Sequence, residues 1–110
     1  MKPYRLREAA LGDIDLALDY YQGIDPELAT GFQGELLAAI AQVQVFPGMG
    51  SARYAQHWLE NAPLLPLRFW LTKRFPYAIF YFDQTQHIEI IRILHQASDI
   101  PQHLKKNKTP

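Results

Sequence analysis

The chain has 110 residues, no cysteine and a formal net charge of zero. This length allows one domain with one hydrophobic core, and the missing cysteines exclude disulfides and thiolate chemistry. No apolar run approaches the roughly 18 residues of a membrane-spanning helix, and the N-terminus lacks the apolar middle of a signal peptide. We therefore expect a cytoplasmic location and no membrane partner.

Charge is distributed unevenly along the chain. Residues 1–67 carry 4 Lys and Arg against 8 Asp and Glu, whereas residues 68–110 carry 7 against 3. A basic C-terminal half is equally compatible with a solvated surface and with an acidic partner or nucleic acid.

The N-terminal part predicts a short strand and then a helix that ends at Gly23. Residues 3–7 alternate apolar and basic side chains, as a strand does. An apolar stripe at helical spacing follows, consisting of Leu11, Ile14, Leu18 and Tyr21. The opposite face carries Asp13, Asp15 and Asp19. We expect these three carboxylates to lie on a solvated helix surface and not to bind a metal.

A second helix has a clear beginning and end. Asp25 can cap its first turn, Pro26 suits the first helical position, and Pro47 with Gly48 stops it. Its apolar stripe consists of Ala29, Phe32, Leu36, Ile40 and Val43. Gly31 and Gly34 lie in its interior, where they either allow close packing or are simply tolerated. Two helices joined by a short loop are expected to pack as an antiparallel hairpin.

Residues 48–66 have the weakest pattern. Residues 51–61 predict a short helix that turns Tyr54, Trp58 and Leu59 inward. Pro63 and Pro66 favour an extended approach to the strand that follows.

Three strands are predicted in the C-terminal half, because three segments alternate apolar and polar side chains or are rich in aromatic and β-branched residues. These segments are residues 67–72, 77–82 and 88–94. Phe75-Pro76 and residues 83–86 form the two connections, giving an antiparallel meander. On the last strand, strict alternation puts Ile88, Ile90 and Leu94 on one face and Ile91 and Ile93 on the other. Such a strand is covered on both sides. Arg92 lies among these residues and must reach solvent or find a partner.

The predicted fold class is α+β. An N-terminal strand, an antiparallel helical hairpin and a three-stranded meander form one sheet whose one face the helices cover. We expect residues 1–104 to form the single domain and residues 105–110 to be a disordered basic tail.

The sequence carries few catalytic signals. It has no Gly-rich phosphate loop, no paired Cys, and four His too scattered for a metal site, so no metal or cofactor is expected. His95 could act as a general acid or base, although a hydrogen-bonded His at a strand end is the commoner arrangement. A phosphate site or a solvated sheet edge could be formed by Arg68, Lys73, Arg74 and Arg92.

Several short motifs follow one another in a characteristic order. They are Asp19-Tyr20-Tyr21, Leu28-Ala29 with Phe32, Pro47, Leu67-Arg68, Arg74-Phe75-Pro76-Tyr77 with Phe80-Tyr81, Ile90-Ile91-Arg92-Ile93-Leu94-His95, and Asp99-Ile100-Pro101. No single motif is specific for one protein family, but the motifs in this order and at this chain length are specific together. Over roughly residues 4–104 the chain resembles the ParE family of toxins, within the RelE/ParE toxin–antitoxin superfamily.

This resemblance implies a helical hairpin on an antiparallel sheet. It implies a bacterial plasmid-stabilisation toxin that inhibits DNA gyrase, does not bind nucleic acid directly, has no catalytic residues, and is wrapped by a ParD-like antitoxin. The target- or antitoxin-binding residues would be Arg68, Arg74, Tyr77, Arg92 and His95. One position departs from the family pattern, since Ser98 stands where relatives often carry Arg.

Two other functions remain open. A ribosome-dependent mRNA endonuclease of RelE type would use His95, Arg74, Arg92 and Tyr77, but such enzymes have a lysine-rich catalytic surface. Here Lys73 is the only Lys between positions 3 and 104. An inactive relative would act as a binding module alone. In the toxin interpretation, we expect the antitoxin to bind across the helical hairpin and a sheet edge.

Overall fold

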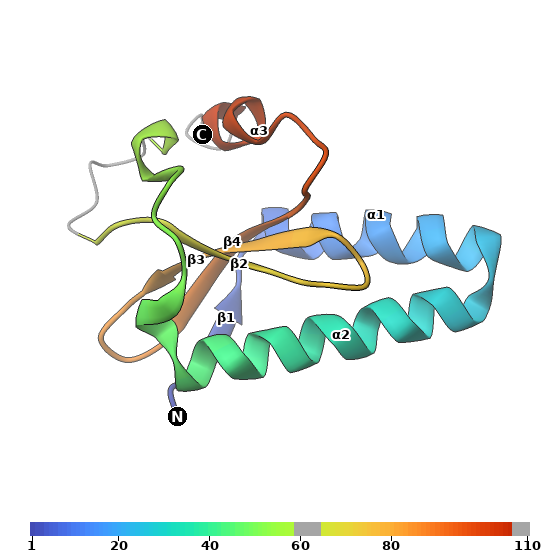
Figure 1. The fold of residues 1–110 in the computed structure, drawn as a ribbon, viewed down its shortest axis with the longest axis horizontal. Coiled ribbons are helices and arrows are strands. Elements are labelled where there is room, and N and C mark those ends of the chain that lie inside the picture. The colour runs from blue at the N-terminus through green and yellow to red at the C-terminus, as the bar shows by residue number, and fades with distance from the viewer. Residues whose placement is uncertain (59–64, 107–110) are drawn as a thin grey trace.

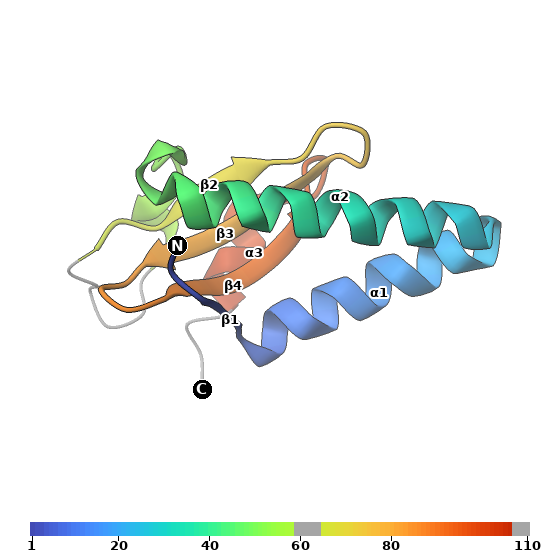
Figure 2. The same cartoon turned by 90° about the horizontal axis from the view of Figure 1, so that it is seen from below.

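The computed structural model describes residues 1–58 and 65–106, and it shows a four-stranded sheet with a helical hairpin on one face (Figure 1). In chain order the elements are β1 (Tyr4–Leu6), α1 (Glu8–Ile24), α2 (Pro26–Val45), the 3-10 turns η1 (Pro47–Met49) and η2 (Ala55–His57), β2 (Arg68–Leu71), β3 (Tyr77–Asp83), β4 (Ile88–His95) and α3 (Ile100–Lys106). Figure 2 shows α1 and α2 side by side across the sheet. The α+β class and the predicted order of elements are confirmed.

The sheet is mixed and has the strand order β1-β4-β3-β2. Strands β2, β3 and β4 form the predicted antiparallel meander. β1, however, pairs in parallel with β4, with Tyr4 opposite Ile88 and Leu6 opposite Ile90. The expectation of a wholly antiparallel sheet is therefore wrong at β1. The two strands are far apart in the sequence, so no tight turn forces them to run in opposite directions.

Strand β4 is buried on both faces, as predicted, but a β-bulge changes which residues share a face. Phe80 lies opposite Arg92 and Tyr81 opposite Ile90, so Ile91 is an extra residue in β4. After the bulge, each residue of β4 faces the side of the sheet opposite to the one that strict alternation predicts. Ile93 consequently joins Ile88 and Ile90 in the cluster under the hairpin, and Leu94 joins Ile91 on the other face. The predicted assignments of Ile93 and Leu94 are therefore wrong.

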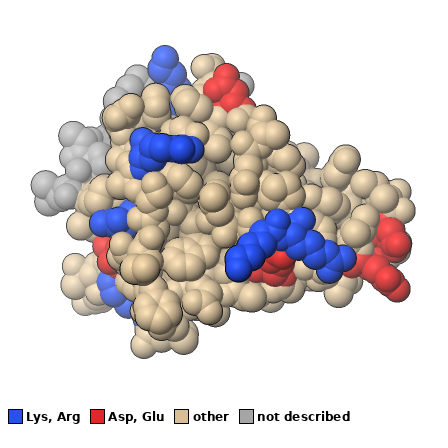
Figure 3. Space-filling model, in the orientation of Figure 1, with Lys and Arg blue, Asp and Glu red and all other residues tan. Residues whose placement is uncertain are grey.

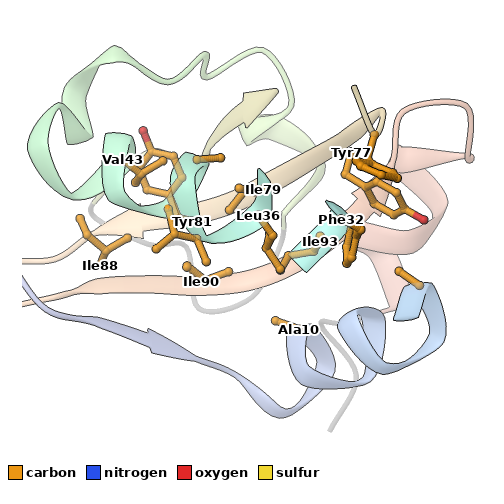
Figure 4. Packing of buried hydrophobic residues seen from close by; sticks show 14 residues of the cluster. Ala10, Phe32, Leu36, Val43, Tyr77, Ile79, Tyr81, Ile88, Ile90 and Ile93 are labelled. Carbon is orange, nitrogen blue, oxygen red and sulfur yellow. The ribbon is translucent and has the colours of Figure 1, made fainter. Parts of the chain in front are cut away.

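The hairpin packs its apolar residues onto one face of the sheet (Figure 4). All five residues of the predicted α2 stripe are buried, together with Ala39. In α1 the buried residues are Ala10 and Ala17, whose small side chains let the helix lie close to the sheet. Ile14, Leu18 and Tyr21 pack at the margin of this core. Leu11 is 48% exposed, so its predicted place in the core is wrong.

The two glycines inside α2 differ in their surroundings. A Cβ atom on Gly31 would lie 3.3 Å from Cζ of Phe75, whereas one on Gly34 would meet nothing within 4 Å. Gly31 therefore lets Phe75 pack against α2, and Gly34 is only tolerated.

The other face of the sheet has a second core. Trp58, Phe80, Ile91 and Leu94 pack there with α3. Within residues 51–58, the described part of the predicted helix over residues 51–61, the structure has the 3-10 turn η2 and no α-helix. Trp58 is buried and Tyr54 is half-buried, as expected. Leu59 and Pro63 lie outside the described residues.

The sequence analysis missed helix α3. Its first turn is capped by Asp99, whose Oδ1 accepts the N–H of Gln102 at 3.2 Å, and Leu104 is fully buried. The helix includes the first two residues of the predicted disordered tail, and residues 107–110 lie outside the described part of the chain. Within residues 1–58 and 65–106, no helix is long and apolar enough to span a membrane.

Candidate functional site

Three of the five predicted binding residues lie together beside α1. Tyr77, at the start of β3, and His95, at the end of β4, line a groove of about 440 Å³ with Tyr20, Tyr21 and Ile24 of α1. An adjoining groove of about 250 Å³ shares Tyr20, Tyr77 and His95 and continues past Leu16 to Arg92. We call these two connected depressions the α1 groove.

An apolar ridge borders the α1 groove. Leu16, Tyr20 and Ile24 are 73%, 64% and 59% exposed, and their spacing of four residues places them in one line along the helix. Large apolar side chains that gather beside a groove mark an interaction surface. The sequence analysis missed this ridge, although its spacing is a second apolar stripe of α1 that could have been recognised.

Arg92 lies in the floor of this site but is engaged within the fold. Its Nε and Nη2 atoms bond to the two carboxylate oxygens of Asp13, each at 2.7 Å, and the side chains are only 13% and 10% exposed. Asp13 Oδ2 also accepts the N–H of Ile93 at 2.8 Å, and Arg92 Nη1 donates to the carbonyl of His103 at 3.4 Å. The pair holds α1, β4 and α3 together. The predicted solvated position of Asp13 is therefore wrong, because its carboxylate serves Arg92.

Tyr77 and His95 are placed as hydrogen-bond donors. Burial, and then a hydrogen bond with Tyr21, raise the pKa of Tyr77, so its hydroxyl stays protonated near neutral pH. His95 Nδ1 accepts the N–H of Ala97 at 3.0 Å, and its ring meets the Tyr77 ring edge-on at a centroid distance of 5.2 Å. A neutral His whose Nδ1 accepts carries its proton on Nε2. Neither side chain is then set up to remove a proton from a substrate.

Neither Arg68 nor Arg74 lines the α1 groove. Arg68 donates to the carbonyl of Gly50 at 2.8 Å, and Arg74 lies in the turn between β2 and β3. The carboxylate of Glu35 fixes this turn by accepting the N–H groups of Arg74 and Phe75 at 3.2 and 3.0 Å. Of the four cations that could have bound one phosphate, Arg92 is thus the one that lines the α1 groove.

No metal site accompanies these residues. Among residues 1–58 and 65–106, no group of three His, Cys, Asp or Glu could hold a metal ion. Nor does any polar side-chain atom in this part of the chain lie buried without a hydrogen-bond partner. What the site offers is a groove, an apolar ridge and a few hydrogen-bond donors.

Comparison with known proteins agrees with this fold. The model of the family described as "ParE toxin of type II toxin-antitoxin system, parDE" matches residues 4–100. A solved structure, a chromosomal ParDE toxin–antitoxin system from P. aeruginosa, has a similar fold, with a TM-score of 0.58 and 21% sequence identity over 86% of this chain and 96% of that one. No curated protein sequence matches. Because the family model covers nearly the whole described domain, this chain belongs to the ParE toxin family of type II toxin–antitoxin systems.

Proposed function

We propose that this protein poisons DNA gyrase by binding to it, and that a ParD-like antitoxin neutralises it. The observation that carries the proposal is the α1 groove, where an exposed apolar ridge meets hydrogen-bond donors that are unsuited to proton abstraction. Inhibition by binding needs such a surface and no catalytic group. The similar solved structure is described as a ParDE system, which supports an antitoxin as the partner. A gyrase target places the toxin in the bacterial cytoplasm.

The RelE-type endonuclease is less well supported. That reaction needs a base to activate the attacking hydroxyl and free cations around the scissile phosphate. Arg92 is committed to Asp13, the pKa of Tyr77 is raised, and His95 presents a proton on its outer nitrogen. The remaining alternative is an inactive relative that binds an antitoxin without harming gyrase.

The role of the α1 groove can be tested with Tyr20→Glu. A carboxylate in the middle of the apolar ridge should weaken inhibition of purified gyrase at least about tenfold, because its desolvation opposes binding. Tyr20 is 64% exposed, so the thermal midpoint should change little. The measurement is the toxin concentration that halves the supercoiling rate.

Leu37→Glu is the matched control. Leu37 is also a large exposed side chain, 51% accessible, but it lies on α2 and lines neither part of the α1 groove. This variant should inhibit gyrase as the unchanged protein does. Equal inhibition by Tyr20→Glu would exclude the α1 groove as the gyrase-binding surface.

A further inference from the structure

The outer edge of β4 borders the α1 groove, but it is blocked to an added strand. β1 pairs with residues 88–90, and among the described residues no strand flanks the rest of β4 on that side. There the N–H of Ile93 points toward α1, where Oδ2 of Asp13 accepts it at 2.8 Å. Asp13 is itself held by Arg92, so this donor is not available to a partner. The α1 groove therefore favours a helix, whose backbone hydrogen bonds are internal, over a strand.

The apolar ridge has the form of a helix-docking surface. Leu16, Tyr20 and Ile24 are each more than half exposed and are spread over about 12 Å of the helix axis. The α1 groove runs beside them, and its lining residues on α1 extend from Asp13 to Ile24. A helix of about two turns that lay along α1 would pack apolar side chains at spacings of three and four residues between ridge and groove.

The charges of the helical hairpin are all negative. Residues 8–52 contain 7 Asp and Glu and no Lys, Arg or His. Asp15 and Asp19 directly precede Leu16 and Tyr20, are exposed, and have no ion-pair partner among the described residues. They are one helical turn apart, a spacing at which like charges destabilise a helix. This arrangement brings the isolated chain no contact in return, which points to a role in binding.

The sign of these charges selects among partners. On the face shown in Figure 3, Asp and Glu side chains gather at the free end of the hairpin, and Lys and Arg side chains are spread over the rest. In the α1 groove the charge of Arg92 is matched by Asp13, so the unmatched charges beside the ridge are those of Asp15 and Asp19. A second copy docking through α1 would bring acids against acids, and an acidic segment would be repelled as well. Charge complementarity therefore favours a basic partner.

We propose that the α1 groove takes a basic amphipathic helix of gyrase. The apolar side chains of this helix pack between the ridge and the groove, and Lys or Arg residues on its flank face Asp15 and Asp19. This rests on the proposed function, because gyrase supplies the helix. Both acids are exposed, so they raise the association rate more than the affinity.

The first test measures the association rate of the full chain with purified gyrase. Asp19→Lys should lower this rate at least about threefold at about 0.05 M salt, and the difference should vanish at about 1 M, where the Debye length is only about 3 Å. Asp19→Lys also removes the repulsion with Asp15, so the thermal midpoint should not fall.

Glu27→Lys is the matched control. It makes the same change of charge at an exposed residue of α2 that lines neither part of the α1 groove. Its association rate should stay within about twofold of that of the unchanged protein. Equal rates for Asp19→Lys and Glu27→Lys, or a loss in Asp19→Lys that persists at high salt, would overturn the proposal.

The second test needs no gyrase. The ¹⁵N-labelled full chain is titrated by NMR with two repeats of Leu-Ala-Lys-Lys-Leu-Leu-Gln, and with the counterpart that has Glu in place of each Lys. The basic peptide should shift the amides of residues 13–24 and 92–95, and the acidic peptide should bind at least about tenfold more weakly. Tighter binding of the acidic peptide would assign the groove to an acidic segment such as one from the antitoxin. That result, or no shifts in the α1 groove at millimolar basic peptide, would overturn the proposal.

The two tests separate this proposal from the proposed function. A chain that binds the basic peptide along α1 but leaves supercoiling unaffected would refute gyrase as the partner and keep the basic helix as the ligand. A chain that inhibits gyrase, shows no preference for the basic peptide and loses nothing in Asp19→Lys would refute the basic helix alone.

Discussion

Replacing Asp13 by Ala is expected to destabilise the fold by about 3–5 kcal/mol, because it leaves a buried charge without its partner. The Arg92 guanidinium would lose both bonds to the carboxylate in a site where its side chain is only 13% exposed. The N–H of Ile93 would lose its acceptor as well. The measurement is the free energy of unfolding from urea denaturation. It gives the loss of stability directly when the dependence of that free energy on urea concentration is the same in both proteins.

Asp15→Ala is the control for this prediction. Asp15 lies on the same helix but is exposed, and it should change stability by no more than about 0.5 kcal/mol. The loss of stability in Asp13→Asn should lie between the losses in Asp13→Ala and Asp15→Ala, since the amide oxygen still accepts a hydrogen bond but carries no charge. Equal stability of the Asp13→Ala and Asp15→Ala variants would mean that the ion pair does not hold α1 to the sheet.

Leu36→Ala is expected to cost roughly 2–5 kcal/mol. Leu36 is 4% exposed and points from α2 into the core that Ile79 and Ile93 form on the sheet (Figure 4). Removing its terminal carbons takes away buried apolar surface and leaves a cavity that the rigid sheet cannot close.

The neighbouring leucine makes a direct comparison. Leu37 is 51% exposed, so Leu37→Ala should alter the free energy of unfolding by no more than about 0.5 kcal/mol. If the thermal midpoint of Leu36→Ala matched that of Leu37→Ala, Leu36 would not belong to the core.

Features that depend on neighbouring residues could be predicted from the sequence. Helix α2 is the clearest case, since its cap at Asp25, its stripe and its stop at Pro47 all lie within one short segment. Asp25 indeed accepts the N–H of Glu27 at 3.0 Å. The three strands of the meander were found for the same reason, because each has its own alternation and the connections between them are short.

Features set by distant contacts could not be predicted. The bulge at Ile91 arises where β3 and β4 pair, and an alternation rule applied to β4 alone gives the wrong face for Ile93 and Leu94. Asp13 belongs to a polar face by its local pattern, and only the tertiary fold brings Arg92 to it.

In the candidate site too, some features could be predicted from the sequence and others depend on distant contacts. His95 could be singled out by its place at a strand end, and Tyr77 through the resemblance to the ParE family. The register of β3 on β4 places the two residues opposite each other. That Arg92 and His103 line the same groove depends on where α3 packs, which no local pattern reveals.

The central claim is that this toxin acts by binding gyrase and not by cleaving RNA. One preparation of the protein should be assayed in parallel for gyrase supercoiling and for in vitro translation, with His95→Ala alongside. We predict that the protein halves the supercoiling rate at concentrations that leave messenger RNA intact and translation unchanged. Ribosome-dependent cleavage of messenger RNA that is lost in His95→Ala, together with unaffected supercoiling, would contradict this account.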